Sequence, residues 1–169
     1  MQSVKSILVF IVVVLLLCAA LIYSGAYNVA ADEPHLKPVS ALLGVIRSRS
    51  IAVRLDNITP PRNLDSEERL VRGGELYGSM CAGCHLGPGV QETGFYKGLN
   101  PQPPRLARHG GDPEPRELFW VIKHGIKMTG MPAWGLTHDD EAIWDTTAFV
   151  MQLPDMSAEE FSRLSSDNP

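Results

Sequence analysis

The chain has 169 residues, of which 44% are hydrophobic and 20% are charged, with a formal net charge of −4. This length suits one domain of ordinary size with an appendage, and the composition is that of a globular protein rather than a disordered one. Residues 32–169 hold 14 of the 15 basic and all 19 acidic residues. An acidic soluble part argues against a nucleic-acid partner, because phosphate binding needs a basic face, and is compatible with a basic protein partner.

The first segment is apolar on every side. Residues 7–22 read ILVFIVVVLLLCAALI, and the 20 residues of 7–26 contain no charge, which as a helix is enough to cross a bilayer core. Lys5 precedes this run and Asp32 and Glu33 follow it, so the positive-inside rule keeps the N-terminus in the cytoplasm and exports the rest.

Two interpretations of residues 1–31 stay open. The length of the apolar run favours an uncleaved transmembrane anchor, whereas Val29-Ala30-Ala31 offers small residues for cleavage of a signal peptide. Both predict residues 32–169 outside the cytoplasmic membrane. We expect a single-pass protein of the inner membrane whose main domain lies in the periplasm.

Residues 32–66 are predicted to be a linker with a possible amphipathic helix. Residues 32–40 contain two prolines and few apolar residues, as a linker does. Residues 41–55 alternate apolar clusters with Arg47, Arg49 and Arg54. This segment is either a juxtamembrane helix with its arginines near lipid headgroups or a helix with an ordinary solvated face.

Helices, and no strands, are predicted for the rest of the chain. Acidic first turns, apolar residues at spacings of three and four, and Gly or Pro at the ends predict helices at residues 65–81, 115–124, 139–152 and 157–164. Residues 87–105 are rich in Gly and Pro and are predicted to be a loop. A loop of that length usually wraps around something.

Cys81-Ala82-Gly83-Cys84-His85 is the motif with the most specific chemistry. Two cysteines one helical turn apart can each form a thioether with one of the two vinyl groups on a porphyrin edge, and the next residue, His85, then lies under the ring as an iron ligand. A thioredoxin-type motif needs βαβ surroundings, and structural zinc needs a second cysteine pair. A plain disulfide leaves His85 unexplained. The motif therefore predicts one haem c, bonded covalently through Cys81 and Cys84.

The ligand on the other side of the iron decides the chemistry. An open position permits O₂ or peroxide chemistry, whereas a filled one restricts the protein to electron transfer. Met131 in TGMPAWG is the preferred candidate, because Pro132 stiffens the backbone and Gly130 allows close approach to a flat ring, and Met128 is its competitor. Lone histidines are predicted to have surface or capping roles: His109, His124 and His138.

These features together resemble the class I cytochromes c, small mono-haem electron carriers, over residues 67–152. Gly73 and Tyr77 precede Cys81 at the family's spacing, and Phe149 occupies the matching aromatic place on the last helix. The resemblance implies that the glycine packs closely against that helix and that the aromatic ring fills the crossing.

Two further segments extend the resemblance. Residues 103–106, PPRL, are similar to the family's Pro-x-Leu segment, which implies that the carbonyl of Pro104 accepts a hydrogen bond from His85 and that Leu106 packs on the ring. GIKMTGMPAWG is similar to the axial-methionine loop of bacterial membrane-associated members. This similarity implies Met131 as iron ligand and Trp134 in contact with a haem propionate.

The predicted fold is therefore all-α, a class I cytochrome c fold at residues 67–153 after an N-terminal transmembrane helix, with a C-terminal tail at residues 154–169. The predicted function is electron transfer with no turnover of a small substrate. Expected partners are the membrane and redox proteins: a dehydrogenase or bc-type complex as donor, an oxidase or reductase as acceptor. The alternatives are a haem subunit of a larger respiratory or dehydrogenase complex, and a peroxidase or gas sensor with a labile sixth ligand.

Overall fold

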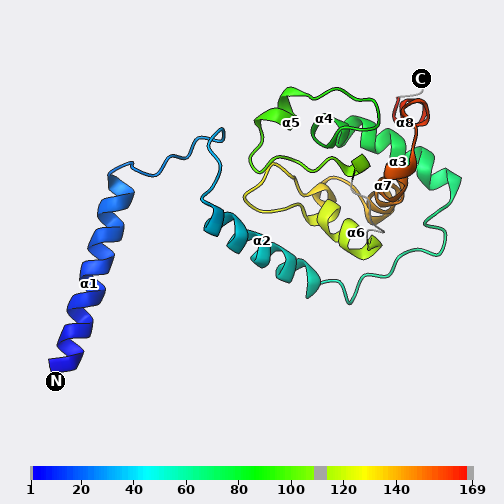
Figure 1. The fold of residues 1–169 in the computed structure, drawn as a ribbon. Coiled ribbons are helices and arrows are strands. Elements are labelled where there is room, and N and C mark those ends of the chain that lie inside the picture. The colour runs from blue at the N-terminus through cyan, green and yellow to red at the C-terminus, as the bar shows by residue number, and fades with distance from the viewer. Residues whose placement is uncertain (1, 109–113, 167–169) are drawn as a thin grey trace. The chain divides into compact units, whose positions relative to one another are not determined.

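The computed structural model describes residues 2–108 and 114–166, and within these ranges it contains helices and no strand (Figure 1). The predicted all-α class is confirmed. The chain divides into two compact units, Met1–Glu33 and Pro34–Pro169. His109, predicted to have a surface or capping role, lies outside the described residues.

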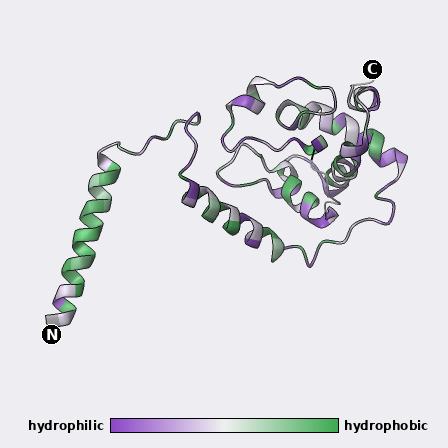
Figure 2. Cartoon of the chain, viewed as in Figure 1, coloured by the Kyte–Doolittle hydropathy of each residue, from purple (hydrophilic) through white to green (hydrophobic). Residues whose placement is uncertain are grey.

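The first unit is a single helix, α1 (Gln2–Tyr23). Its segment Ser3–Tyr23 is long and apolar enough to cross a membrane, and a stretch of 18 residues within it has a mean hydropathy of 3.1. Figure 2 shows this helix as hydrophobic along most of its length. Its 22 residues correspond to about 33 Å of helix, close to the thickness of a bilayer core.

The second unit begins with α2 (Lys37–Ala52), which starts earlier than predicted. The interpretation of residues 37–40 as linker is wrong, because Pro38 stands in the first turn, where its missing N–H would have had no helical partner. Ile51 of α2 is buried, and α2 lies beside α6 (Pro115–His124).

The centre of this unit is the crossing of α3 (Glu67–Met80) and α7 (Asp140–Gln152). At Gly73 an added Cβ would lie 2.0 Å from the backbone oxygen of Asp145, so only glycine permits this approach. The rings of Tyr77 and Phe149, both fully buried, lie 5.3 Å apart at the crossing. The close glycine contact and the aromatic pair implied by the resemblance are confirmed.

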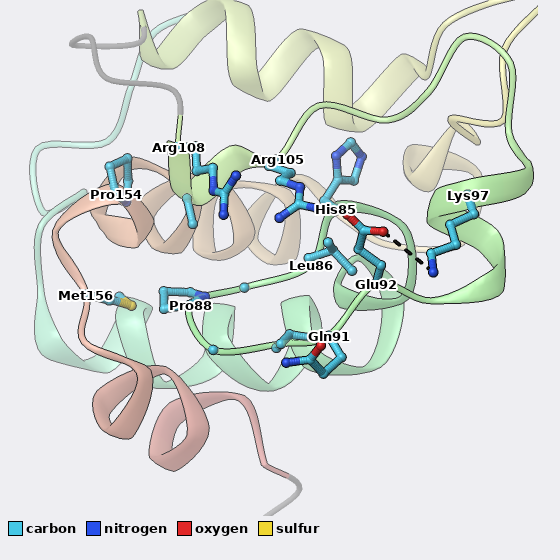
Figure 3. A pocket seen from close by; sticks show the side chains of 14 residues that line it. His85, Leu86, Pro88, Gln91, Glu92, Lys97, Arg105, Arg108, Pro154 and Met156 are labelled. Carbon is cyan, nitrogen blue, oxygen red and sulfur yellow. Dashed lines mark hydrogen bonds and ion pairs between the residues drawn. The ribbon is translucent and has the colours of Figure 1, made fainter.

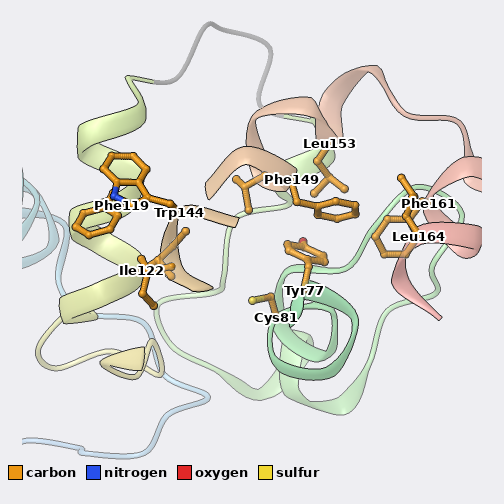
Figure 4. Packing of buried hydrophobic residues seen from close by; sticks show 11 residues of the cluster. Tyr77, Cys81, Phe119, Ile122, Trp144, Phe149, Leu153, Phe161 and Leu164 are labelled. Atoms are coloured by element: carbon orange, nitrogen blue, oxygen red, sulfur yellow. The ribbon is translucent and has the colours of Figure 1, made fainter. Parts of the chain in front are cut away.

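Aromatic contacts extend this core on two sides (Figure 4). On one side, α8 (Ala158–Ser165) places the ring of Phe161 edge-on to Tyr77, with centroids 6.0 Å apart. On the other side, Phe119 of α6 stacks on Trp144 of α7 at 4.1 Å. Both α3 and α6 are therefore packed against α7.

A buried ionic cluster also joins α3 to α7, and the sequence pattern did not reveal it. Arg69 Nη1 donates to Asp145 Oδ1 at 2.6 Å, and Arg72 Nε donates to Asp145 Oδ2 at 2.6 Å. Arg69 and Asp145 are each only 4% exposed. Glu141, whose side chain is 70% exposed, accepts a further bond from Arg69 at 2.8 Å.

The segment predicted to be one long loop contains a short helix. α5 (Gly94–Gly98) interrupts it, and its N-cap Thr93 accepts a hydrogen bond from the amide of Tyr96 at 3.0 Å. The remaining short elements are α4 (Ala82–His85), η1 (Leu106–Arg108), η2 (Trp134–Leu136) and η3 (Leu153–Asp155).

Candidate haem site

The CxxCH motif forms a single turn of helix at the end of α3. The amides of Cys84 and His85 both donate to the carbonyl of Cys81, at 3.0 and 2.8 Å. This turn separates the two cysteines by one helical repeat, as the predicted attachment requires. In the described part of the chain all three cysteines are free thiols, so Cys81 and Cys84 are not joined in a disulfide.

Cys81 is buried beside Tyr77, and this environment changes its acidity (Figure 4). Burial raises the pKa of the Cys81 thiol to about 12, and the neighbouring Cys84 adds to this shift. Reactive cysteines of redox enzymes have lowered pKa values, because the thiolate is the nucleophile. The buried Cys81 thiol is therefore neutral at physiological pH, whereas Cys84 is only half-buried.

His85 is held in the form that can ligate a metal. Its Nδ1 lies 2.9 Å from the carbonyl oxygen of Pro104, which can only accept, so Nδ1 carries the proton and Nε2 has a free lone pair. Burial lowers the pKa of His85, while the bond to Pro104 opposes this shift. The imidazole is therefore neutral and oriented, and the contact implied by the family resemblance is present.

Leu86, directly after the histidine, turns the chain sharply and was not predicted. It has φ 61° and ψ −166°, a conformation populated essentially by glycine, and its side chain is only 2% exposed. The buried Tyr77 hydroxyl donates to the Leu86 carbonyl at 2.6 Å and holds this conformation. On the other side of the motif, the hydroxyl of Thr93 donates to the carbonyl of Gly83. Both contacts join residues that no local pattern connects.

The loop that carries Met131 is closed by its own hydrogen bonds. Thr129 Oγ1 donates to the Ile126 carbonyl at 2.7 Å and accepts from the Met131 amide at 3.1 Å. The Ile126 amide in turn donates to the Met131 carbonyl at 3.2 Å. The loop begins at Gly125, whose φ of +64° and close approach to Pro132 both exclude a side chain.

The two candidate methionines point in different directions. Met131 is half-buried and packs against the apolar core that contains Cys81. Met128 is 74% exposed, with a φ of 63°. Gly130 lies against the side chain of Leu99, where an added Cβ would be 2.6 Å from Cδ2. Burial therefore favours Met131 over Met128 as the residue available to the site.

The remaining predicted residues are brought to the same region. Leu106 and Trp134 pack against the apolar core together with Met131, whereas Pro104 contacts His85 directly. Trp134 also meets the ring of His138 edge-on, with centroids 5.7 Å apart. The exposed His124 lies against Trp120, with centroids 4.9 Å apart, as expected for a surface histidine.

A polar cavity of about 560 Å³ opens beside His85 and Leu86 (Figure 3). Its wall includes Glu92, which pairs with Arg105 and lies 3.6 Å from Lys97 Nζ. Arg105 also donates to the Tyr96 hydroxyl at 2.9 Å. This ionic cluster ties the chain after the motif to the segment that contains Pro104.

The donor set fits a haem c. The chain supplies the groups that such a cofactor requires: a neutral imidazole with a free Nε2, two free thiols one helical turn apart, and a half-buried thioether on a second loop. The all-helical fold and this site define a mono-haem c-type cytochrome, a protein of electron transport.

Comparison with known families agrees with this class. A family model described as cytochrome c oxidase, cbb3-type, subunit III matches residues 68–150. The match contains the CxxCH motif, Pro104 and the Met131 loop. No curated protein and no solved structure gives a match. Residues 68–150 are therefore a cytochrome c domain, preceded in the chain by a helix able to span a membrane.

Proposed function

We propose that this chain transfers single electrons on one haem c, bonded covalently to Cys81 and Cys84 and ligated by His85 and Met131. The observations that support the proposal are the hydrogen bond between His85 and Pro104 and the packing of Met131 against the core, where Met128 is exposed. When bound, haem c supplies reversible one-electron chemistry between Fe(III) and Fe(II).

The chain's own residues hold both ligands in place. Pro104 keeps the imidazole in one tautomer, and the hydrogen bonds of Thr129 keep the Met131 loop closed. Leu106 and Trp134 pack against the apolar core. We assign Leu106 to packing on the haem ring and Trp134 to a contact with a haem propionate. With His85 and Met131 both holding the iron, no position would remain open for peroxide or gas, and the reduction potential would be higher than with two histidine ligands.

The proposal extends to the arrangement along the chain. Residues 1–31 are the uncleaved anchor, residues 32–66 the spacer and residues 67–153 the cytochrome domain. Residues 154–169 are a C-terminal extension whose helix α8 packs on that domain through Phe161. The length and hydropathy of α1 support anchoring in the inner membrane, and Lys5 before it supports a periplasmic cytochrome domain. The electron donor is a dehydrogenase or bc-type complex, and the acceptor is an oxidase or reductase.

A second candidate has a specific observation in its favour. The matching family model describes an oxidase subunit, which supports a role as the haem subunit of a respiratory complex rather than a free carrier. Extraction in mild detergent distinguishes the two roles. Co-purification of an oxidase or dehydrogenase in stoichiometric amount would show that the chain is a subunit of that complex. A monodisperse single chain that exchanges electrons with soluble donors would show that it is a free carrier.

The ligand assignment is tested with two matched methionine variants. Met131→Ala should abolish the long-wavelength iron–sulfur charge-transfer absorption of the oxidised protein and lower its reduction potential, because a thioether ligand raises that potential. Met128→Ala should retain both, because that side chain is exposed. Loss of the band in Met128→Ala, or its absence from the unmodified protein, would refute the assignment and favour the peroxidase or sensor alternative.

A further inference from the structure

The helix α2 has an apolar face that the cytochrome domain leaves uncovered. Val39, Leu42, Val45 and Ile46 are 39%, 60%, 61% and 53% exposed. They recur at helical spacing on one side of α2, away from Ile51, which is buried and attaches the helix to the domain beside α6. We call these four exposed side chains the outer face of α2.

The segment around this face is basic in a chain that is otherwise acidic. Residues 34–55 contain Lys37, Arg47, Arg49 and Arg54 and no acidic residue. Residues 56–169, by contrast, contain ten basic and seventeen acidic residues. Arg47 and Arg49 are exposed, and Arg54 donates to the carbonyl of Ser50 at 2.6 Å. Exposed apolar side chains in a segment whose charged residues are all basic match an anionic bilayer, which has an apolar interior and negatively charged headgroups.

The chain itself brings such a surface within reach. Thirteen residues, 24–36, separate the end of α1 from the start of α2. A fully extended segment of that length spans at most about 45 Å, so an anchored α1 restricts α2 to the zone next to the bilayer.

We propose that the outer face of α2 lies in the headgroup region of an anionic lipid bilayer, with Arg47 and Arg49 beside lipid phosphates. This inference rests on the membrane anchoring in the proposed function and adds to it a second, oriented contact. A single anchored helix with a flexible tether leaves the cytochrome domain free to rotate. Docked α2, fixed to the domain through Ile51, would hold the haem site at one orientation to the membrane.

Lipid suits this face better than a protein partner does. An acidic protein could also meet these basic residues, but the anchored chain itself holds only the bilayer within reach of α2. Each arginine near anionic headgroups shifts the docking equilibrium about fivefold toward the docked state. This attraction falls off within a Debye length.

The test uses the full holoprotein reconstituted in vesicles, with an environment-sensitive fluorophore at a single cysteine. Cys18, a free cysteine within α1, is replaced in the Cys18→Ser background, and Ile46→Cys in that background places the label on the outer face of α2. Glu159→Cys in the same background places it on the exposed side of α8 as a matched control, and native Cys18 reports on the anchor. Quenching by nitroxide on lipid acyl chains is compared with quenching by aqueous iodide, in vesicles with and without phosphatidylglycerol.

In anionic vesicles the label at position 46 should be quenched by lipid nitroxide and protected from iodide, and the label at position 159 should show the opposite. Arg47→Gln with Arg49→Gln should lower the docked-to-undocked ratio about 30-fold, and high salt should act in the same direction. A label exposed to water at position 46, together with a label in lipid at Cys18, would overturn the docking inference and leave the anchor intact. That result would favour a protein partner for this face. A label in lipid at position 46 but not at Cys18 would support the docking inference and refute the anchor. Water at both positions would refute both.

Discussion

The close approach of α3 and α7 at Gly73 predicts a large effect from a single methyl group. In Gly73→Ala the new Cβ would lie 2.0 Å from the backbone oxygen of Asp145, 2.7 Å from its carbonyl carbon and 3.0 Å from the Cβ of Phe149. Ordinary van der Waals contact begins at 3.4 Å, so the two helices must separate by about 1.4 Å. Two of these three atoms belong to the backbone, and no rotamer change relieves the contact.

The magnitude follows from two opposing contributions. Overpacking of a tight core costs about 1–3 kcal/mol, with rigid backbone contacts at the upper end, and alanine returns about 1 kcal/mol of helix propensity. With the cost at its upper end, the net loss in the free energy of unfolding is therefore about 2 kcal/mol, or roughly 8 °C in the unfolding temperature for a domain of this size. Thermal unfolding of the full holoprotein in detergent, followed by circular dichroism, measures this shift.

Gly44→Ala in α2 is the matched control. A Cβ at Gly44 meets nothing within 4 Å, so this variant should be more stable by up to about 1 kcal/mol from helix propensity alone. Equal unfolding temperatures for Gly73→Ala and the unmodified protein would show that the helices do not meet at this glycine. The reasoning about the crossing would then fail.

Two further changes probe the contacts around the motif. Tyr77→Phe removes the donor to the Leu86 carbonyl and should cost about 1–3 kcal/mol in denaturant unfolding at neutral pH. Burial raises the pKa of Tyr77 above its ordinary value of 10.0, so the unmodified protein loses stability as pH rises past that value, while the variant lacks this loss. The difference between the two should therefore narrow above pH 10, and a constant difference would contradict the burial argument. Asp145→Asn leaves Arg69 buried without a full negative partner and should cost about 3 kcal/mol, whereas Glu141→Gln, on an exposed side chain, should stay within about 0.5 kcal/mol. Equal effects of these two variants would contradict the assignment of Asp145 as the centre of the cluster.

The sequence predicted the helices wherever local signals were strong. The bounds of α6 agree with the prediction residue for residue, because Pro115 and Gly125 mark its ends in the sequence itself. The linker interpretation of Pro38 misses the start of α2, because proline is common in a first helical turn. α5 was missed because Gly94 and Gly98 at its two ends are typical of a loop.

What the sequence could not predict are contacts between distant residues. The pairing of Arg69 with Asp145 joins positions 76 apart, and no periodicity connects them. The left-handed backbone of Leu86 is equally hidden, because leucine is not a residue that signals a positive φ. The CxxCH motif and the Met131 loop, in contrast, were visible because their chemistry depends on residues adjacent in the chain.

The two proposed ligands depend on one shared helix. His85 follows α3 and Met131 follows α6, and both helices pack against α7, the first through Gly73 and the second through the stack of Phe119 on Trp144. The separation between the imidazole and the thioether is therefore set by α7, which supplies neither of them. A change at the crossing should then move one ligand relative to the other. Gly73→Ala should thus weaken the iron–sulfur charge-transfer band as well as stability, although Gly73 itself lies eight residues before Cys81.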